Sequence, residues 1–215
     1  MPPDREQATI PAHGDGRYMR VGLFGGSFNP VHDGHIQLAR RALRQLGLDQ
    51  VWFLVSPGNP LKPVAGMAPM AERLAGVRAR IHSVRQRRLV ATDIEARLGT
   101  RYTFDTLRRL KRLFPHVRFV WLMGADGLAQ MGRWRRWQDI VSMVPFAVLP
   151  RPGYNPAALH GRVARRLACW RLPARAARLL PMCAPPAWVF LPAPQNAISA
   201  TQIRASRAAC GHERE

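Results

Sequence analysis

The chain has 215 residues, and its content of 47% hydrophobic and 21% charged residues is that of ordinary globular proteins, which excludes disordered and fibrous classes. Its formal net charge of +20 comes almost wholly from arginine, since only Lys62 and Lys111 are lysines among 33 basic residues, and such a field attracts anions of any kind. The arginines are spread over most predicted helices without a long basic run or interleaved aromatics, so we expect no specific nucleic-acid partner, although a basic nucleic-acid-binding module stays open as an alternative.

The hydrophobic pattern marks a first strand and a first helix. Residues 1–17 contain no uninterrupted apolar stretch, and we expect them to form a flexible extension before a single domain over residues 18–215. Met19–Phe24 is an apolar run of strand length. Apolar residues then recur with helical spacing over Ile36–Leu46, and Gly47 ends this predicted helix.

Strands and helices alternate along the rest of the chain. Strands are predicted over Val51–Val55, Leu89–Ile94, Val117–Met123, Phe146–Leu149 and Val189–Leu191, and helices over Met70–Val84, Thr103–Leu113 and Ala157–Ala168. Prolines between residues 57 and 63 exclude a helix in that loop. Uninterrupted apolar strands that alternate with helices are typical of a parallel sheet covered on both faces, so we predict a single-domain, doubly wound α/β fold with a mainly parallel sheet.

The turn GGSFNPVHDGH, residues 25–35, lies at the carboxyl end of the first predicted strand, where ligands of such folds bind. Gly25 and Gly26 allow close backbone approach and unusual dihedral angles, as a phosphate-binding turn requires. His32 and His35 stand at the start of the next helix, where imidazoles can donate hydrogen bonds to phosphate oxygens. Capping histidines and a two-histidine metal site are the alternatives, but no third ligand is evident, and we expect no protein-bound metal.

A second candidate segment, ISATQIR, occupies residues 198–204. Its pattern predicts a helix start with Ser199 as the N-cap, Thr201 in the first turn and Arg204 one turn further on. Free N–H groups and a guanidinium would then face one direction and suit a triphosphate. An ordinary capped surface helix is the alternative.

Three motifs in this order resemble those of a known superfamily. GGSFNPVHDGH is similar to the GGxFxPxHxGH signature of the HxGH nucleotidyltransferases, GADGLAQMGRW (residues 124–134) resembles their GxDxLxxxxxW segment, and ISATQIR resembles their second phosphate element, with Ala200 where serine is most common. PRPGY (residues 150–154) and RYTFDTL (residues 101–107) extend the resemblance from residue 19 to about 207. The chain is most similar to the bacterial nicotinate-nucleotide adenylyltransferases, which implies a Rossmann-like nucleotidyltransferase fold.

The resemblance implies adenylyl transfer from ATP to nicotinate mononucleotide, which gives deamido-NAD and pyrophosphate. The implied catalytic residues are His32, His35 and Arg204, and the implied ATP-binding residues are Gly25, Gly26, Ser27, Phe28, His35, Ile198, Ser199, Thr201 and Arg204. The nucleophile is already an anion, so catalysis needs positioning and charge neutralisation but no general base. Mg²⁺ is expected to arrive with ATP and to take few protein ligands.

The resemblance places the nicotinate mononucleotide site at Lys62, Tyr102, Thr103, Asp126 and Trp134. The indole of Trp134 would stack on the pyridine ring, and Asp126 would hold a ribose hydroxyl or orient its loop. We expect backbone N–H groups at Thr103 and Trp134 to favour the nicotinate carboxylate over an amide. Lys62 follows a leucine where the family often has histidine, so a surface lysine without a role in binding stays an alternative for Lys62. The corresponding alternatives are a core or rim tryptophan for Trp134 and a helix-capping residue for Asp126.

Related activities and the cellular location are also constrained. Pantetheine-phosphate adenylyltransferase is the nearest rival, but it typically has threonine at the position of His32 and a shorter chain; lipid-precursor cytidylyltransferases carry an RTxGIST-like element that is absent here. Cys169, Cys183 and Cys210 are odd in number and lack CxxC spacing, which favours a reducing cytoplasm. No apolar run approaches the roughly 20 residues of a membrane span, so we expect no membrane association.

Overall fold

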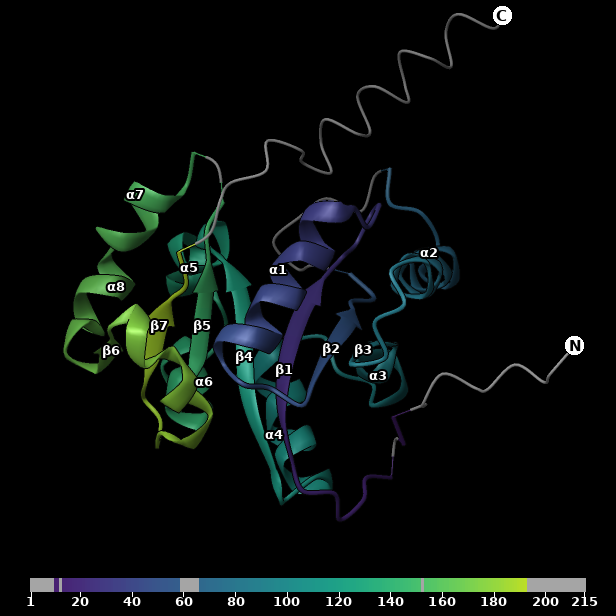
Figure 1. Ribbon diagram of the computed structural model, residues 1–215, viewed down its shortest axis with the longest axis horizontal. Coiled ribbons are helices and arrows are strands. Elements are labelled where there is room, and N and C mark those ends of the chain that lie inside the picture. The colour runs from purple at the N-terminus through teal and green to yellow at the C-terminus, as the bar shows by residue number, and fades with distance from the viewer. Residues whose placement is uncertain (1–9, 12, 59–65, 152, 193–215) are drawn as a thin grey trace, which may run out of the picture.

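The computed structural model describes residues 10–11, 13–58, 66–151 and 153–192. Its strands are β1 (Met19–Gly26), β2 (Gln50–Val55), β3 (Leu89–Thr92), β4 (Val117–Gly124), β5 (Phe146–Leu149), β6 (Arg171–Leu172) and β7 (Trp188–Phe190). They form one sheet of order β3-β2-β1-β4-β5-β7-β6, in which every pair of neighbours is parallel (Figure 1). The predicted parallel sheet is confirmed.

Helices connect these strands. They are α1 (Asp33–Gln45), α2 (Met70–Ser83), α3 (Ile94–Arg97), α4 (Thr103–Leu113), α5 (Ala125–Gln130), α6 (Trp137–Met143), α7 (Asn155–Leu159) and α8 (Arg162–Arg166), with 3₁₀ segments η1 (Met131–Arg133), η2 (Ala168–Trp170) and η3 (Ala174–Met182). Gly47, with φ of 62°, ends α1 in the left-handed conformation that glycine adopts at little cost. The helix predicted over 103–113 is observed with these bounds.

Two predicted elements have different bounds. The helix predicted over residues 157–168 is instead two short helices, α7 and α8, because the chain turns at Gly161, a residue of low helix propensity. This turn lets Ala158 and Val163 both enter the core. The strand predicted to reach Ile94 ends at Thr92, whose Oγ1 accepts a hydrogen bond from the N–H of Ile94 and starts α3.

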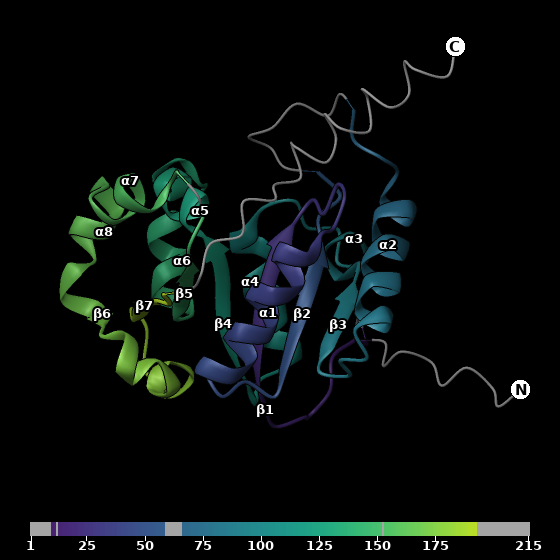
Figure 2. The same ribbon diagram turned by 45° about the horizontal axis from the view of Figure 1, so that its top comes forward.

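Alternate side chains of each strand enter one of two cores. One core lies under α1, α2 and η3, and includes Phe53 and Leu122. The other lies under α4, α5, α6 and α8, and includes Trp52 and Trp121. Figure 2 shows α1 in front of the strands and α4 behind them, which is the doubly wound arrangement predicted from the sequence.

The order of the strands reverses between β1 and β4. The chain runs outward from β1 through β2 to β3, and then returns to place β4 on the other side of β1. The carboxyl ends of β1 and β4 therefore border the crevice in which open α/β sheets bind ligands. Within the described ranges, no helix is long and apolar enough to cross a bilayer.

The segment before β1 is attached to the domain at the residues that the structure describes. Ile10 is 2% exposed and belongs to the core under α4. The N–H of Asp15 donates to the carbonyl of Leu113 at 3.2 Å, and the carboxylate of Asp15 binds the guanidinium of Arg17. The flexible extension over residues 1–17 stays a prediction, and residues 1–9 and 12 of it lie outside the described residues.

Candidate active site

The two predicted histidines meet at the first turn of α1. His32 is the N-cap in an extended conformation, and its N–H donates to Nδ1 of His35 at 3.3 Å. The N–H of His35 donates in return to the carbonyl of His32 at 2.9 Å, and the two ring centroids lie 3.9 Å apart. Because Nδ1 of His35 accepts a hydrogen bond, this neutral ring carries its proton on Nε2, where it can be donated to a ligand.

Both histidines are buried, and one lacks partners. His32 and His35 are 6% and 7% exposed, and among the residues that the structure describes neither ring nitrogen of His32 has a hydrogen-bond partner. Burial, together with the positive charge of Arg151, lowers the pKa of His32 to about 4. Burial, then His32 and then Arg151, lowers the pKa of His35 well below its ordinary value. Buried polar groups without partners are rare in native proteins, which makes this pair a candidate ligand site.

Arg151, a residue that the sequence prediction did not select, faces this pair. It follows β5, and its main-chain N–H donates to Oδ1 of Asn155 at 2.8 Å. Its Nε lies 3.5 Å from Oδ1 of Asp126, in the first turn of α5. Asp126 therefore orients an arginine at the crevice in this structure. A cation beside two neutral imidazoles creates a site for an anion.

The glycines of the turn act by permitting close contact. Gly25 and Gly26 are the last two residues of β1, and neither has a positive φ. The expectation of unusual dihedral angles at these two glycines is therefore wrong. A Cβ on Gly25 would lie 2.8 Å from the indole of Trp121, and one on Gly26 would lie 3.1 Å from the ring of Phe28. The left-handed residue is Phe28, with φ of 47°, a conformation that costs energy in a residue with a side chain.

The ring of Phe28 is part of the core. It packs on Phe24, Phe53 and His35 at centroid distances of 5.7, 5.3 and 5.2 Å. Only the backbone of this residue is free to line a nucleotide site. Its left-handed turn brings the main chain from β1 to His32, and its ring supports one face of His35.

Arg73 supports the turn at Ser27 through hydrogen bonds to main-chain carbonyls. Nothing in the sequence distinguishes it from the other arginines. It is buried in α2, and its guanidinium donates to the carbonyls of Ser27 at 2.7 Å, Ser56 at 2.8 Å and Ala68 at 2.9 Å. Burial lowers its pKa from the usual arginine value. Arg73 therefore ties the turn at Ser27 to the loop after β2.

The second half of the crevice contains the residues predicted to bind the pyridine ring. Tyr102 is the N-cap of α4 and Thr103 its first residue. Trp134 follows η1, and its ring stands at 90° to that of Trp121 with centroids 6.3 Å apart. Because Trp121 also covers Gly25, one indole connects the two halves. The prediction that the main-chain N–H of Trp134 is free to bind the nicotinate carboxylate is wrong, since this N–H donates to the carbonyl of Met131 at 2.9 Å.

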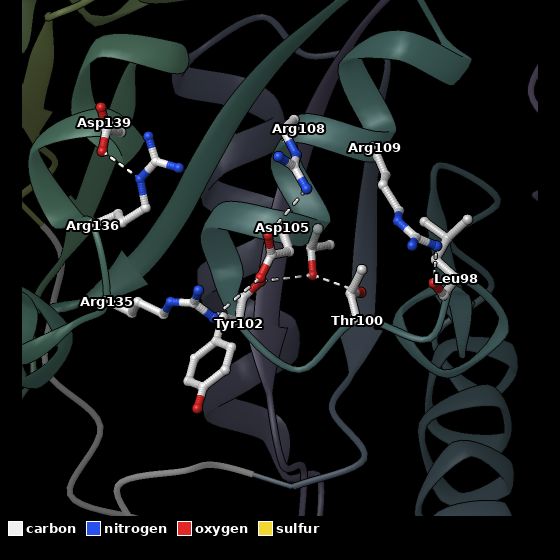
Figure 3. Close-up of polar contacts among 10 residues, drawn as sticks. Leu98, Thr100, Tyr102, Asp105, Arg108, Arg109, Arg135, Arg136 and Asp139 are labelled. Carbon is white, nitrogen blue, oxygen red and sulfur yellow. Dashed lines mark hydrogen bonds and ion pairs between the residues drawn. The ribbon is translucent and has the colours of Figure 1, made fainter.

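A buried network supports the start of α4. Glu95 is 7% exposed, and Oγ1 of Thr106 donates to its Oε1 at 3.1 Å. Oγ1 of Thr106 also lies 2.9 Å from Oγ1 of Thr100 and 3.3 Å from the carbonyl of Tyr102 (Figure 3). Burial raises the pKa of Glu95 to about 7, although the bond from Thr106 opposes the shift. The network joins α3 to the turn at Tyr102.

Five predicted site residues lie outside the described part of the chain: Lys62, Ile198, Ser199, Thr201 and Arg204. Their roles stay predictions. Among the described residues, no group of three or more His, Cys, Asp or Glu side chains could hold a metal ion.

Comparison with known proteins identifies the family. A sequence model of the family described as cytidylyltransferase-like matches residues 23–206. A protein of Gluconacetobacter diazotrophicus, named a probable nicotinate-nucleotide adenylyltransferase, is 68% identical over 199 residues, which cover 93% of this chain and 91% of that protein. The chain belongs to the cytidylyltransferase-like family, in its group of nicotinate-nucleotide adenylyltransferases. A Gluconobacter oxydans protein of the same name is 59% identical over 188 residues, which cover 87% of this chain and 95% of that protein.

Solved structures agree on the fold. Nicotinic acid mononucleotide adenylyltransferase of Plasmodium falciparum, complexed with NaAD, superposes with a TM-score of 0.66 at 16% identity and covers 87% of this chain and 83% of its own. The same protein complexed with APC gives a TM-score of 0.64 at 15% identity, with the same shares of the two chains. At this identity the likeness concerns the fold, and it confirms the predicted nucleotidyltransferase architecture. The range matched by the family includes both predicted phosphate segments, residues 25–35 and 198–204.

Proposed function

We propose that this protein transfers the adenylyl group of ATP to the phosphate of nicotinate mononucleotide and thereby makes deamido-NAD and pyrophosphate. A phosphate oxygen of the mononucleotide forms a bond to the α-phosphorus of ATP. The bond from this phosphorus to the oxygen that bridges to the β-phosphate breaks, and pyrophosphate leaves with the electron pair. The observation that carries this proposal is the buried His32–His35 pair beside Arg151, in which both ring nitrogens of His32 lack a partner within the described part of the chain.

The histidines would act on the transferring phosphate. The Nε2 proton of His35 and a ring proton of His32 are donated to oxygens of the α-phosphate, where negative charge builds up as the two phosphates approach. Arg151 adds a fixed positive charge that Asp126 orients at 3.5 Å. The main chain of Gly25, Gly26, Ser27 and Phe28 lines the ATP site, and Arg73 keeps this turn in place. Rate acceleration then comes from positioning and charge neutralisation.

The leaving pyrophosphate would be held by the C-terminal motif. Ile198, Ser199, Thr201 and Arg204 are assigned to it by their resemblance to the family motif, with Arg204 as the residue that grips phosphate oxygens. Mg²⁺ would arrive with ATP, would neutralise part of the charge of the phosphates and would need few protein ligands. We also propose that the reaction takes place in the cytoplasm, where ATP is abundant and the unpaired cysteines stay reduced.

The pyridine nucleotide would occupy the crevice between α4 and η1. Trp134 stacks on the pyridine ring, Thr103 donates its main-chain N–H near the carboxylate, and Tyr102 forms the edge of the site. Lys62 is proposed to meet the phosphate of the mononucleotide. Because the N–H of Trp134 is already bonded to Met131, it does not take part in recognition of the carboxylate.

The test is a comparison of second substrates. The full chain is incubated with ATP, Mg²⁺ and one of nicotinate mononucleotide, phosphopantetheine or RNA, while pyrophosphate release and the adenylylated product are measured. We expect turnover with nicotinate mononucleotide alone. Turnover with phosphopantetheine instead would establish the rival adenylyltransferase, which the names of the relatives do not favour.

A further inference from the structure

The segment that follows η1 contacts the start of α4 through exposed arginines, and one of them, Arg135, reaches the N-cap residue Tyr102. The guanidinium carbon of Arg135 lies 4.9 Å from the centroid of the Tyr102 ring, and its Nη1 lies 3.8 Å from Oδ2 of Asp105. Figure 3 shows the side chain of Arg135 extending toward Tyr102 and Asp105. Arg135 therefore joins the two segments proposed to bind the pyridine ring, although about 30 residues separate them in the chain.

Neighbouring arginines are bound more tightly. Nε of Arg136 donates to Asp139 at 2.8 Å, and its guanidinium lies 3.9 Å from the centroid of the Phe104 ring. Arg109 donates to the carbonyl of Leu98. The contact of Arg135 with Asp105 is longer than a hydrogen bond, and its side chain is 59% exposed. Arg135 therefore has N–H donors available to a ligand.

Recognition of a carboxylate in this crevice needs such donors. The main-chain N–H of Trp134 is already bonded to the carbonyl of Met131. The first N–H groups of a helix have no partner within the helix, so that of Thr103, the first residue of α4, is a main-chain donor of the right kind. A guanidinium presents two parallel N–H donors that match both oxygens of a carboxylate. A carboxamide has only one oxygen that can accept these bonds. Its NH₂ group is itself a donor and cannot bond to the N–H groups of the guanidinium.

We propose that Arg135 is the specificity-determining residue that selects the acid form of the pyridine nucleotide over the amide form. This inference rests on the proposed function, because it assigns the charge that reads the carboxylate of nicotinate mononucleotide. Tyr102 supports the face of the guanidinium, and Asp105 holds it near the pyridine ring without occupying its donors. Trp134, the preceding residue, stacks on the ring of either nucleotide and does not discriminate.

The experiment measures kcat/KM for nicotinate mononucleotide and nicotinamide mononucleotide in the unmodified chain and in the variants Arg135→Gln and Arg135→Lys. We expect Arg135→Gln to lower kcat/KM for the acid by about 10-fold or more and to leave that for the amide within about 2-fold, because only the acid loses a charged partner. Arg135→Lys should retain part of the preference for the acid, since a lysine ammonium keeps the positive charge but cannot form the two parallel hydrogen bonds of a guanidinium. Arg108→Gln is the matched control, since Arg108 is similarly exposed and pairs with the same aspartate at 3.4 Å.

Two outcomes would overturn the assignment. An unchanged ratio of acid to amide in Arg135→Gln would show that its guanidinium does not read the carboxylate. An equal fall for both nucleotides, together with a lower melting temperature, would show that Arg135 only packs on Tyr102. Failure of the proposed function is a different result, because the unmodified chain would then show no turnover with nicotinate mononucleotide.

Discussion

Two buried polar clusters lie at the same edge of the sheet, and they differ in whether their polar groups have partners. In the threonine–glutamate network, Thr106 is shared among Glu95, Thr100 and the carbonyl of Tyr102. In the histidine pair, His32 is as deeply buried as Glu95, yet neither of its ring nitrogens forms a hydrogen bond with a described residue. Burial of a polar group costs free energy unless a partner compensates for it. The first cluster thus contributes to stability, and the second retains its bonding capacity for a ligand.

The strongest test of this difference is removal of His35. We expect His35→Ala to lower kcat by about 100-fold or more, equivalent to about 2.7 kcal/mol, because a donor to the transferring phosphate is lost. His32→Ala should behave similarly. The melting temperature of His32→Ala should change little, since the His32 ring makes no hydrogen bond in the described part of the chain. His35→Ala should lose some stability, because the His35 ring packs on Phe28 and its Nδ1 accepts a hydrogen bond from the N–H of His32. Steady-state kinetics and thermal unfolding decide the matter, with the exposed His82→Ala as the control. Full kcat in the His35 variant would remove the pair from the mechanism.

The opposite pattern is expected in the network. Thr106→Val keeps the shape of the side chain but removes three polar contacts, so we expect the free energy of unfolding to fall by roughly 1–3 kcal/mol. kcat should change far less than in the histidine variants. Urea unfolding measures the first effect, and Ser83→Ala, which removes an exposed hydroxyl, is the control. Undiminished stability would mean that the network is not structural.

Arg151 connects the histidine pair to the rest of the crevice, and its effect should be intermediate. Removal of its charge in Arg151→Gln should raise the pKa of His32 above about 4, because Arg151 is one of the two causes of the lowered value. We expect kcat/KM to fall by about 10-fold as positive charge is lost near the phosphates. NMR titration of the His32 ring measures the first effect, and the exposed Arg165→Gln serves as control. An unchanged pKa of His32 in Arg151→Gln would mean that Arg151 does not lie beside the histidines in solution.

The smallest expected effect is the pH dependence of the network. Because burial raises the pKa of Glu95 from 4.5 to about 7, the folded state binds more protons than the unfolded state between these values. Stability is therefore full below about pH 4.5 and falls as pH rises to about 7. Glu95→Gln cannot ionise, so it should be more stable than the unmodified chain at pH 8 by on the order of 1 kcal/mol. Denaturant unfolding at pH 5 and pH 8 tests this, and an equal difference at both pH values would contradict it.

The sequence by itself determined most of the architecture. Apolar runs such as Val117–Met123 and the helical spacing over Thr103–Leu113 depend on local periodicity, which burial against a sheet imposes directly on the chain. The position of His32 and His35 between a strand and a helix was visible for the same reason. Where local signals were weak, prediction failed: the turn at Gly161 and the two-residue strand β6 (Arg171–Leu172) became evident only from their packing.

Tertiary structure decided which residues make the site. The sequence has 33 basic residues of nearly one kind, and no local pattern separates Arg73 and Arg135 from the others. Arg151 stands in the PRPGY segment, residues 150–154, but that resemblance assigns it no role. Their roles follow from distances across the fold: Arg73 reaches the carbonyl of Ser27, Arg135 faces Tyr102, and Arg151 lies beside the histidines because β5 is the strand next to β4. The sequence pattern likewise favours unusual dihedral angles at Gly25 and Gly26, but the residue with a left-handed backbone is Phe28, whose buried ring offsets the cost of that conformation. Periodicity is a local property of the chain, whereas the partner of a charge is set by which strands become neighbours.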